Sequence, residues 1–278
     1  MKYEKFCLNS LKTLSSSFFN VPIFELSKYK RDEKQQIDKK KTNIREKVPL
    51  SMKTPFFNTR SEYPDEKREF KNFSEQRKVW ETIADSWSML RNKPEEIILK
   101  IADNTNIGPV LDVACGNGRN LLPFAEKNLV CVGLDFSKSM IREARKFLKR
   151  RGAKAMLVVG DASRLPFKDN SFHLVIFVRS LHNLITKADR LIALRECRRV
   201  GKRLVLSVWK KWQRRFILKL LMNFFSSDLL IDWNYHGKVY KRFYHLYTKK
   251  ELERELRMAG YTSFKMFDDG KGNLWIIA

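Results

Sequence analysis

Residues 110–118, VLDVACGNG, decide the fold of this chain. The apolar run VLDV predicts a buried strand, and the turn that follows it contains Gly116 and Gly118. A second apolar run, VCVGLD at 130–135, predicts a neighbouring strand that also ends in a carboxylate, Asp135. Strands separated by helical periodicity are typical of a doubly wound α/β sheet, in which ligands bind beyond the carboxyl ends of the strands.

The same alternation continues to the end of the chain. Helical spacing and capping residues predict helices at 79–87, at 94–102, from about 118, from Ser137, at 187–199 and at 248–260. Further apolar runs predict strands at 157–159, 173–178, 203–208, 262–267 and 273–278. The fold class that we predict is therefore α/β, with a seven-stranded, mostly parallel sheet and helices on both faces.

The turn after the first strand favours one kind of cofactor. A nicotinamide-binding turn has a third glycine, in the pattern G-x-G-x-x-G, and that glycine is missing here. Asp112, in the strand beside the turn, would repel a pyrophosphate but attract a ligand that carries an ammonium and a sulfonium group. S-adenosylmethionine is such a ligand. Gly116 and Gly118 would let the backbone approach it where a Cβ atom would clash.

Two further carboxylates suit the same ligand. Asp135 is placed to accept hydrogen bonds from both ribose hydroxyls, and Asp161 from the adenine amino group, with Ala162 offering its amide. We predict a cofactor site formed by Asp112, Ala114, Gly116, Gly118, Asp135, Phe136, Asp161, Ala162 and Val178. The plainer interpretation is that these are ordinary turn glycines and capping aspartates.

The motifs DVACGNG, GLD and GDA, in this order at strand ends, resemble those of the class I, Rossmann-like S-adenosylmethionine-dependent methyltransferases over most of residues 75–278. Ala114 stands where that family frequently has glycine. Residues 178–183, VRSLHN, lack the Asn/Asp-Pro-Pro-aromatic tetrad of enzymes that methylate base amino groups, which disfavours that reaction. Cys115, in the turn, and Cys197, in a predicted helix, give no support to a nucleophilic cysteine.

Several segments resemble a narrower family, the tRNA methyltransferases that esterify 5-carboxymethyluridine at the anticodon wobble position. The matching segments are WETIADSW…RNKP (80–94), SLHNL (180–184), ADRLIALRECRRV (188–200), VW (208–209), DW (232–233), KRFYHLY (241–247) and GNLW (272–275). The resemblance implies that Asp135 serves the cofactor and that His182, Arg242 and Arg91 form the catalytic site. It also implies a small zinc-binding activator subunit that covers an apolar edge of the domain.

Two positions depart from that family's pattern. Asn183 stands where a second His is usual, and His173 stands where an Asp is usual. A substrate carboxylate is already ionised at neutral pH, so it needs no strong general base and catalysis is mostly positioning. Arg242 and Arg91 would bind a tRNA phosphate or the substrate carboxylate, and His182 would line the pocket. The alternatives are that His182 is a pocket-wall histidine whose hydrogen bonds are satisfied, and that Arg242 is a surface ion-pair residue.

The composition indicates a polyanionic partner. The chain has 278 residues, a formal net charge of +25 and a pI of about 10.0. We predict tRNA as that partner, against the alternative of a chain that uses Lys wherever a surface charge suffices. The basic run 210–225, KKWQRRFILKLLMNFF, carries Phe216, Leu220, Leu221 and Phe224 at helical spacing. Such a helix suits contact with tRNA, contact with a membrane surface, or a lid.

The organisation that we expect is a basic, loosely ordered extension at 1–73 and a methyltransferase domain at 74–278, with an insert at 210–241. The 4 cysteines form no CxxC pair, which predicts no zinc site, no disulfide framework and a reducing cytoplasm. We expect no membrane span, because no apolar run approaches about 18 residues. Two functions compete with tRNA methylation: methylation of a quinone, lipid or metabolite, and RNA binding without catalysis.

Overall fold

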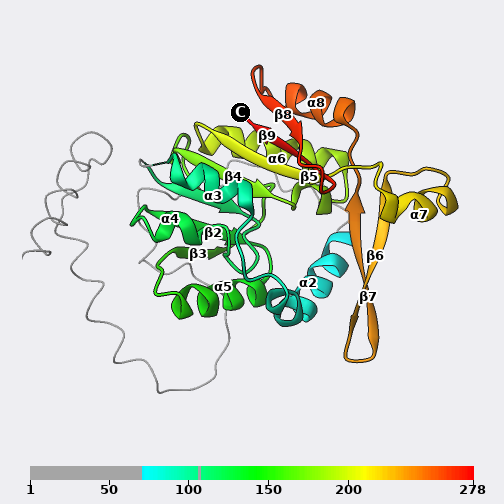
Figure 1. Cartoon of the computed structure of the whole chain (residues 1–278), viewed down its shortest axis with the longest axis horizontal. Coiled ribbons are helices and arrows are strands. Elements are labelled where there is room, and N and C mark those ends of the chain that lie inside the picture. Colours follow the sequence, from blue (N-terminus) through cyan, green and yellow to red (C-terminus); the bar gives the residue numbers. More distant parts are fainter. Residues whose placement is uncertain (1–70, 106–107) are drawn as a thin grey trace, which may run out of the picture. The chain divides into compact units, whose positions relative to one another are not determined.

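A seven-stranded sheet lies at the centre of the described part of the chain (Figure 1). The computed structural model describes residues 71–105 and 108–278, and all that follows concerns the unit Asn58–Ala278. The extension predicted at 1–73 falls outside the described residues, except for 71–73 at the start of the first described helix.

The strand order is that of a doubly wound sheet with one reversed strand. From one edge to the other it runs β3-β2-β1-β4-β5-β9-β8. Neighbours from β3 to β5 are parallel, whereas β9 is antiparallel to both β5 and β8. The predicted α/β class with a mostly parallel sheet is confirmed. The strands are β1 (Val110–Val113), β2 (Cys131–Asp135), β3 (Met156–Val159), β4 (Leu174–Val178), β5 (Leu204–Trp209), β8 (Lys265–Asp268) and β9 (Asn273–Ile277).

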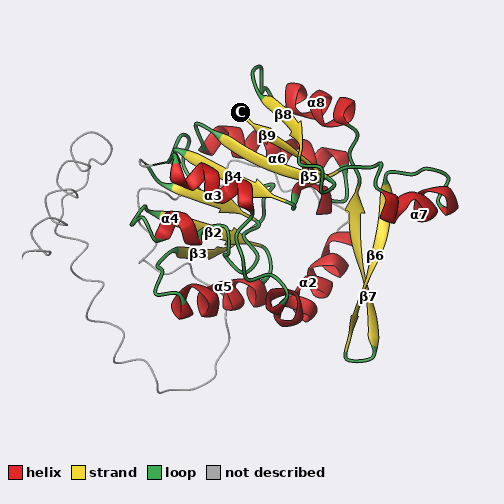
Figure 2. Cartoon of the chain, in the orientation of Figure 1, coloured by secondary structure: helices red, strands yellow, loops and turns green. Residues whose placement is uncertain are grey.

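Helices flank this sheet (Figure 2). Several begin at the capping residues that the sequence offers: the side chains of Ser137 and Thr248 accept hydrogen bonds from the backbone N–H groups of Met140 and Glu251. The described helices are α2 (Lys71–Met89), α3 (Glu96–Asp103), α4 (Leu122–Ala125), α5 (Lys138–Arg150), α6 (Lys187–Val200), α7 (Ile217–Met222) and α8 (Lys249–Met258), with 3₁₀ turns at Leu181–Asn183 and Arg214–Phe216.

The central strands are buried along their whole length. Every residue of β1, β2 and β4 is buried, as expected for parallel strands that are covered on both faces. On one face, Ile98 of α3 and Phe124 of α4 join the core cluster that contains Val110 and Ile176. The acidic residues of β1 and β2 therefore lie in an apolar interior, near the carboxyl ends of the strands, where a ligand is expected.

The region of the predicted insert contains a hairpin that the sequence analysis did not anticipate. β6 (Asp228–Tyr235) and β7 (Lys238–His245) form a separate two-stranded antiparallel sheet. The turn residues His236 and Gly237 both have positive φ, at 47° and 70°, as in the tight turns that match the twist of a hairpin. The hairpin packs on α2, with Trp233 donating to the Ser86 hydroxyl at 3.0 Å.

The prediction of a helix over 210–225 is wrong in its length. Only Ile217–Met222 form an α-helix there. Of the four residues at helical spacing, Phe216 and Leu220 are buried, but Leu221 is 52% exposed and Phe224 is 95% exposed. The pattern fails because Phe224 lies beyond the helix end, in a loop with left-handed backbone, so helical spacing no longer fixes its direction.

Across residues 71–105 and 108–278, no helix is both long enough and apolar enough to cross a membrane.

Candidate functional site

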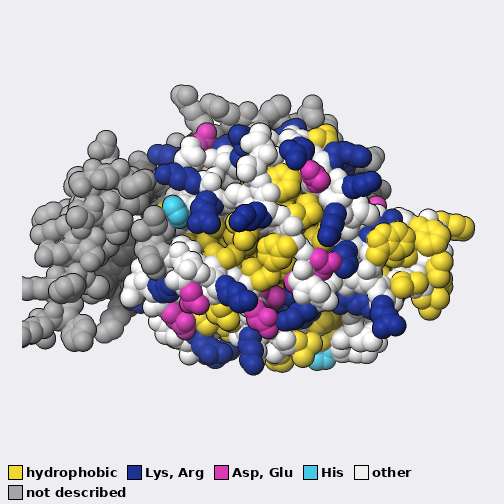
Figure 3. Space-filling model, turned by 45° about the horizontal axis from the view of Figure 1, so that its top comes forward, with side chains coloured by type: hydrophobic (Ala, Val, Ile, Leu, Met, Phe, Trp, Pro, Cys, Tyr) yellow, Lys and Arg dark blue, Asp and Glu magenta, His cyan; other side chains and the backbone are white. Residues whose placement is uncertain are grey.

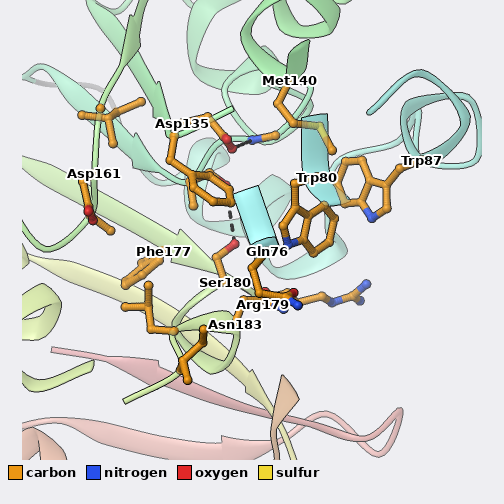
Figure 4. A pocket seen from close by; sticks show the side chains of 18 residues that line it. Gln76, Trp80, Trp87, Asp135, Met140, Asp161, Phe177, Arg179, Ser180 and Asn183 are labelled. Atoms are coloured by element: carbon orange, nitrogen blue, oxygen red, sulfur yellow. Dashed lines mark hydrogen bonds between the residues drawn. The ribbon is translucent and has the colours of Figure 1, made fainter. Parts of the chain in front are cut away.

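A cavity lies beyond the carboxyl ends of β1, β2 and β4 (Figure 4). Its empty space amounts to about 820 Å³, including the part that is open to solvent. Of the predicted cofactor residues, Ala114, Gly116, Asp135, Phe136, Asp161 and Ala162 line it, whereas Asp112, Gly118 and Val178 do not. The other lining residues are Gln76, Trp80, Trp87, Leu134, Met140, Gly160, Phe177, Arg179, Ser180, Asn183, Leu184 and Ile185.

The turn after β1 has the backbone that a close ligand approach requires. Gly116 has φ +55°, and a Cβ atom there would lie 3.1 Å from the Trp87 ring. Its N–H donates to Asp135 Oδ2 at 2.8 Å, and the Ser137 N–H donates to Oδ1 at 2.9 Å. Gly118 has a different task, because a Cβ there would meet Ala144 of α5 at 3.3 Å. Gly116 shapes the pocket, and Gly118 allows the helix to pack.

Ala114 takes an unusual conformation for a residue with a side chain. Its φ is 54°, in the left-handed region, which costs a non-glycine residue about 1–2 kcal/mol. This is the position at which the resembled family frequently has glycine. The strained residue lines the cavity, and such strain gathers at functional sites.

The buried carboxylates are both poised for positively charged or hydrogen-donating ligand groups. Burial raises the pKa of Asp135 to about 6 and that of Asp112 well above its ordinary value. Asp112 Oδ2 is buried without a hydrogen-bond partner. An ammonium group near Asp112 would supply the missing donor and favour the ionised carboxylate, so the residues present fit S-adenosylmethionine.

The opposite walls of the cavity differ in character. Asp161 lies on one side, where its Oδ1 accepts from the Ser163 N–H at 2.8 Å. Trp80 and Trp87 lie on the other side, from α2, with Gln76 nearby (Figure 4). The two indole rings meet edge to face with centroids 6.1 Å apart. An aromatic wall therefore faces the carboxylate wall across the cavity.

The α2 wall was missed by the sequence analysis, although a signal was present. Gln76 and Trp80 are four residues apart, and Trp87 follows seven residues later, so all three share one face of the helix. Helical spacing was read only as core packing. It is the docking of α2 on α5 and on the hairpin that turns this face toward the cavity.

His182, predicted to line the pocket, is fully buried and is not among its lining residues. Its Nδ1 accepts from the Trp209 N–H at 2.9 Å, so the proton belongs on Nε2, which is buried without a partner. Burial and nearby cations, Arg179 first among them, lower the pKa of His182 to about 3. It is neutral at physiological pH. The next residue, Asn183, lines the cavity instead.

Arg242 is buried without a counter-ion. It is 4% exposed, and it forms no ion pair with any residue in the described ranges. Nη1 donates to the Tyr244 hydroxyl at 3.0 Å, while Nε is buried without a partner. The guanidinium lies 4.7 Å from the Trp233 ring centroid. The surface ion-pair interpretation of Arg242 is therefore wrong.

Arg91 lies close to Arg242 and is equally unpaired within the described part of the chain. Its guanidinium lies 4.7 Å from the Trp87 ring centroid and 5.6 Å from that of Trp233, the same ring that contacts Arg242. Burial and the neighbouring arginines lower its pKa to about 10. Asn117 of the glycine turn donates to the Arg91 carbonyl at 2.6 Å. The turn that shapes the cavity therefore also holds the Arg91 segment.

Arg179, directly after β4, is a pocket residue that the sequence analysis did not select. It lines the cavity, has φ 54°, and pairs with Glu95 at 2.6 Å. Glu95 also pairs with Arg119 at 2.5 Å. One carboxylate thus pairs with two cations, while Arg91 and Arg242 pair with no carboxylate in the described part of the chain. Arg179 lines the cavity, whereas Arg91, Arg119 and Arg242 lie outside its lining. This group of cations suits an anionic ligand that binds near the cavity.

Nucleophilic cysteine chemistry finds no support here. Cys115 and Cys197 are buried, and burial raises the pKa of both thiols. Neither side chain lines the cavity.

The comparisons with known proteins identify the family of the chain. A sequence family described as "Methyltransferase domain" matches residues 110–203. A putative methyltransferase of Encephalitozoon cuniculi (strain GB-M1) is 36% identical over 168 residues, which is 58% of this chain and 72% of that protein. The chain belongs to the class I S-adenosylmethionine-dependent methyltransferases. The buried carboxylates and the glycine turn of its site fit S-adenosyl-L-methionine as the cofactor.

Other relatives of this methyltransferase differ in the substrate that their names give. The tRNA (carboxymethyluridine(34)-5-O)-methyltransferase alkbh8 of Xenopus tropicalis is 28% identical over 233 residues, covering 63% of this chain and 36% of that protein. A demethylmenaquinone methyltransferase of Thermotoga maritima is 39% identical over 115 residues, covering 41% and 45%. The chain thus spans less than half the length of these two relatives.

A solved structure shows the same fold. The S-adenosylmethionine-dependent methyltransferase of Methanosarcina mazei aligns with a TM-score of 0.52 and 24% identity, covering 66% of this chain and 96% of that one. At this identity the likeness concerns the fold alone.

Proposed function

We propose that this methyltransferase transfers a methyl group to the carboxylate of 5-carboxymethyluridine at the wobble position of tRNA. The observation that carries the proposal is Arg242, a buried cation beside the cavity that has no counter-ion among residues 71–105 and 108–278. An unpaired buried charge is costly, and a phosphate or carboxylate of the substrate would supply the missing anion. Arg91, which shares the Trp233 ring with it, would complete a two-arginine site.

The absence of a suitable general base supports a substrate that is already ionised. Among the described residues that line the cavity there is no histidine, lysine or cysteine. His182, behind the wall, is neutral and uses Nδ1 as an acceptor for a backbone N–H. Asp135 has both carboxylate oxygens engaged by backbone donors. A carboxylate attacks the sulfonium methyl group with a lone pair and loses no proton, so this reaction needs no base.

Within the proposal, Asp135 would bind the ribose of the methyl donor, Asp161 and Ala162 its adenine, and Asp112 its ammonium group. Arg242 and Arg91 would hold the anion of the tRNA, and the formal net charge of +25 would favour association with the polyanion. The name of the Xenopus relative, with its carboxymethyluridine substrate, agrees with this assignment. His182 would act as a positioning residue, through Trp209 and Tyr244.

The zinc-binding activator subunit implied by the resemblance stays part of the proposal. β3 is an edge strand of the sheet, and Met156 and Val159 on it are 36% and 42% exposed. An apolar edge of this kind needs cover, and we assign that role to the activator. A homogeneous and fully active preparation of the chain alone would remove the need for it.

The test is transfer of label from methyl-labelled S-adenosylmethionine to tRNA that carries unesterified carboxymethyluridine. The expected product is a methyl ester, so mild alkali should release the label. Arg242→Gln should lower the rate at limiting tRNA by about a hundredfold, because it removes the cation that would bind the anion of the tRNA, whereas Arg145→Gln on the exposed face of α5 should not change it. Alkali-stable label, or transfer to demethylmenaquinone but not to tRNA, would contradict the proposal.

A further inference from the structure

The segment 210–225 exposes an unusual concentration of large apolar side chains. Phe224 is 95% exposed, Met222 76% and Leu218 69%. Figure 3 shows an apolar area at the right of the view, where Figure 1 places α7. We call residues 210–225 the docking segment. Its exposed apolar residues are Trp212, Ile217, Leu218, Leu221, Met222, Phe224 and Phe225.

This exposure is built into the fold. α7 is anchored on one side only, where Phe216 and Leu220 join a small core cluster with Leu229 of the hairpin. Phe224 and Phe225 both have left-handed backbone, with φ 46° and 57°, which is rare for bulky residues. The loop is held in this form, because the Phe225 carbonyl accepts from Lys211 Nζ at 2.6 Å.

The charge of the docking segment has one sign. Residues 210–227 contain Lys210, Lys211, Arg214, Arg215 and Lys219 and no acidic residue. Arg214, Arg215 and Lys219 are exposed. Lys210 is paired with Asp268 at 2.5 Å, so Lys211, Arg214, Arg215 and Lys219 carry the net charge of the segment. The nearest acidic side chain along the chain, Asp228, is paired with His245 at 2.6 Å. The apolar residues therefore emerge within a cationic surround.

These features distinguish between possible occupants. A second copy of the chain would bring the same cations against themselves, which is unfavourable. Single-stranded RNA stacks on aromatic rings, and gives no reason to expose Leu218, Leu221 and Met222 to water. The segment projects from the body of the described unit (Figure 1), so it suits a deformable partner. Apolar side chains with a basic surround are the combination that binds an anionic lipid surface.

We propose that residues 210–225 dock this methyltransferase on anionic membranes, with Phe224, Phe225 and the exposed face of α7 inserted among the lipids. Lys219, Arg214 and Arg215 then face the lipid headgroups. The proposal does not depend on the identity of the methylated substrate.

The experiment is co-sedimentation of the full chain with phosphatidylcholine vesicles that contain or lack phosphatidylserine. We expect binding to the anionic vesicles and at least tenfold weaker binding by Phe224→Ser, which leaves the net charge unchanged. Lys219→Glu should weaken binding more than fivefold, since each surface charge contributes about 1 kcal/mol. Because Phe224 is 95% exposed, its replacement should leave the unfolding temperature unchanged.

Methionine offers a matched control. Met222→Ser removes a side chain of the docking segment, and Met258→Ser removes one that is 47% exposed on α8. We expect only Met222→Ser to weaken vesicle binding. Equal binding by wild type and Phe224→Ser would refute the proposal, because general basicity would then explain the attraction. Vesicle binding could persist in Phe224→Ser while a dimer seen in sedimentation velocity is lost, which would assign the segment to a second copy of the chain. If tRNA affinity were lost instead, the segment would be assigned to tRNA.

Discussion

S-adenosylhomocysteine, the product that remains after methyl transfer, should bind this protein more weakly in acid because of Asp135. Burial raises the pKa of this carboxyl group to about 6, and the ionised form is the better acceptor for the two ribose hydroxyls. At about pH 5, one unit below that pKa, only about a tenth of the free protein has Asp135 ionised. The affinity for S-adenosylhomocysteine should therefore be about tenfold lower at pH 5 than at pH 7.5 from this group alone.

The raised pKa of Asp135 also affects the free energy of unfolding. Because the folded pKa lies above the ordinary value of 3.8, Asp135 contributes stability that is present below pH 3.8 and lost as the pH rises through 6. The loss amounts to about 3 kcal/mol for a shift of about two units. Ligand binding, which favours ionised Asp135, should then raise the unfolding temperature more at pH 7.5 than at pH 5.

Isothermal titration calorimetry with S-adenosylhomocysteine across this pH range measures the effect. Asp135→Asn should bind S-adenosylhomocysteine more weakly than wild type at pH 7.5. Between pH 7.5 and pH 5 its affinity should fall by about tenfold less than that of wild type. We assign any fall in affinity that remains to Asp112. Asp103→Asn, at an exposed position on α3, should behave as wild type. If wild type and Asp135→Asn lost affinity in parallel, or wild type showed no pH dependence, the assignment of Asp135 to the ribose would fail.

Three further substitutions test other parts of the site. Ala114→Gly should raise the free energy of unfolding by about 1 kcal/mol in urea titrations, because φ 54° strains a residue with a Cβ atom; a destabilised variant would contradict this. His182→Asn should reduce the loss of stability between pH 7 and pH 5 by about 2 kcal/mol, since a pKa lowered from 6.5 to about 3 makes the protein lose stability as the pH falls; equal pH slopes would exclude it. Arg242→Met should abolish methylation while leaving the unfolding free energy equal or higher, because it removes an unpaired buried charge; a loss of several kcal/mol would show that Arg242 is structural.

The sequence was sufficient for the sheet because buried parallel strands are apolar along their whole length. The runs at 110–113 and 173–178 needed no tertiary information, and their carboxyl ends meet at one edge whatever the details of packing. The β6–β7 hairpin was missed for the opposite reason. Its strands mix charged and aromatic residues, and only the turn at His236 and Gly237 indicates it.

The candidate site divides along the same line. The glycine turn and Asp135 could be found because they are adjacent in sequence to the strands that position them. Trp87 could not, because its place depends on α2 crossing over the cavity. Arg91 is predicted only by the family resemblance, since its place depends also on the hairpin that packs on α2. His182 was expected in the pocket from its neighbours in the sequence, yet the 3₁₀ turn at 181–183 directs it toward Trp209 and leaves Asn183 at the cavity.

The distribution of charge around the cavity is what the proposed reaction needs. When a methyl group passes from a sulfonium to a carboxylate, a positive and a negative charge disappear together, so the transition state is less charged than the reactants. Removing water from both groups therefore raises the energy of the reactants more than that of the transition state. The Trp80 and Trp87 wall excludes water on one side of the cavity. An arginine held directly on the reacting carboxylate would oppose this gain by stabilising its charge. The buried position of Arg242 behind that wall, outside the cavity lining, thus favours a phosphate of the tRNA as its anion and leaves the carboxylate free to attack.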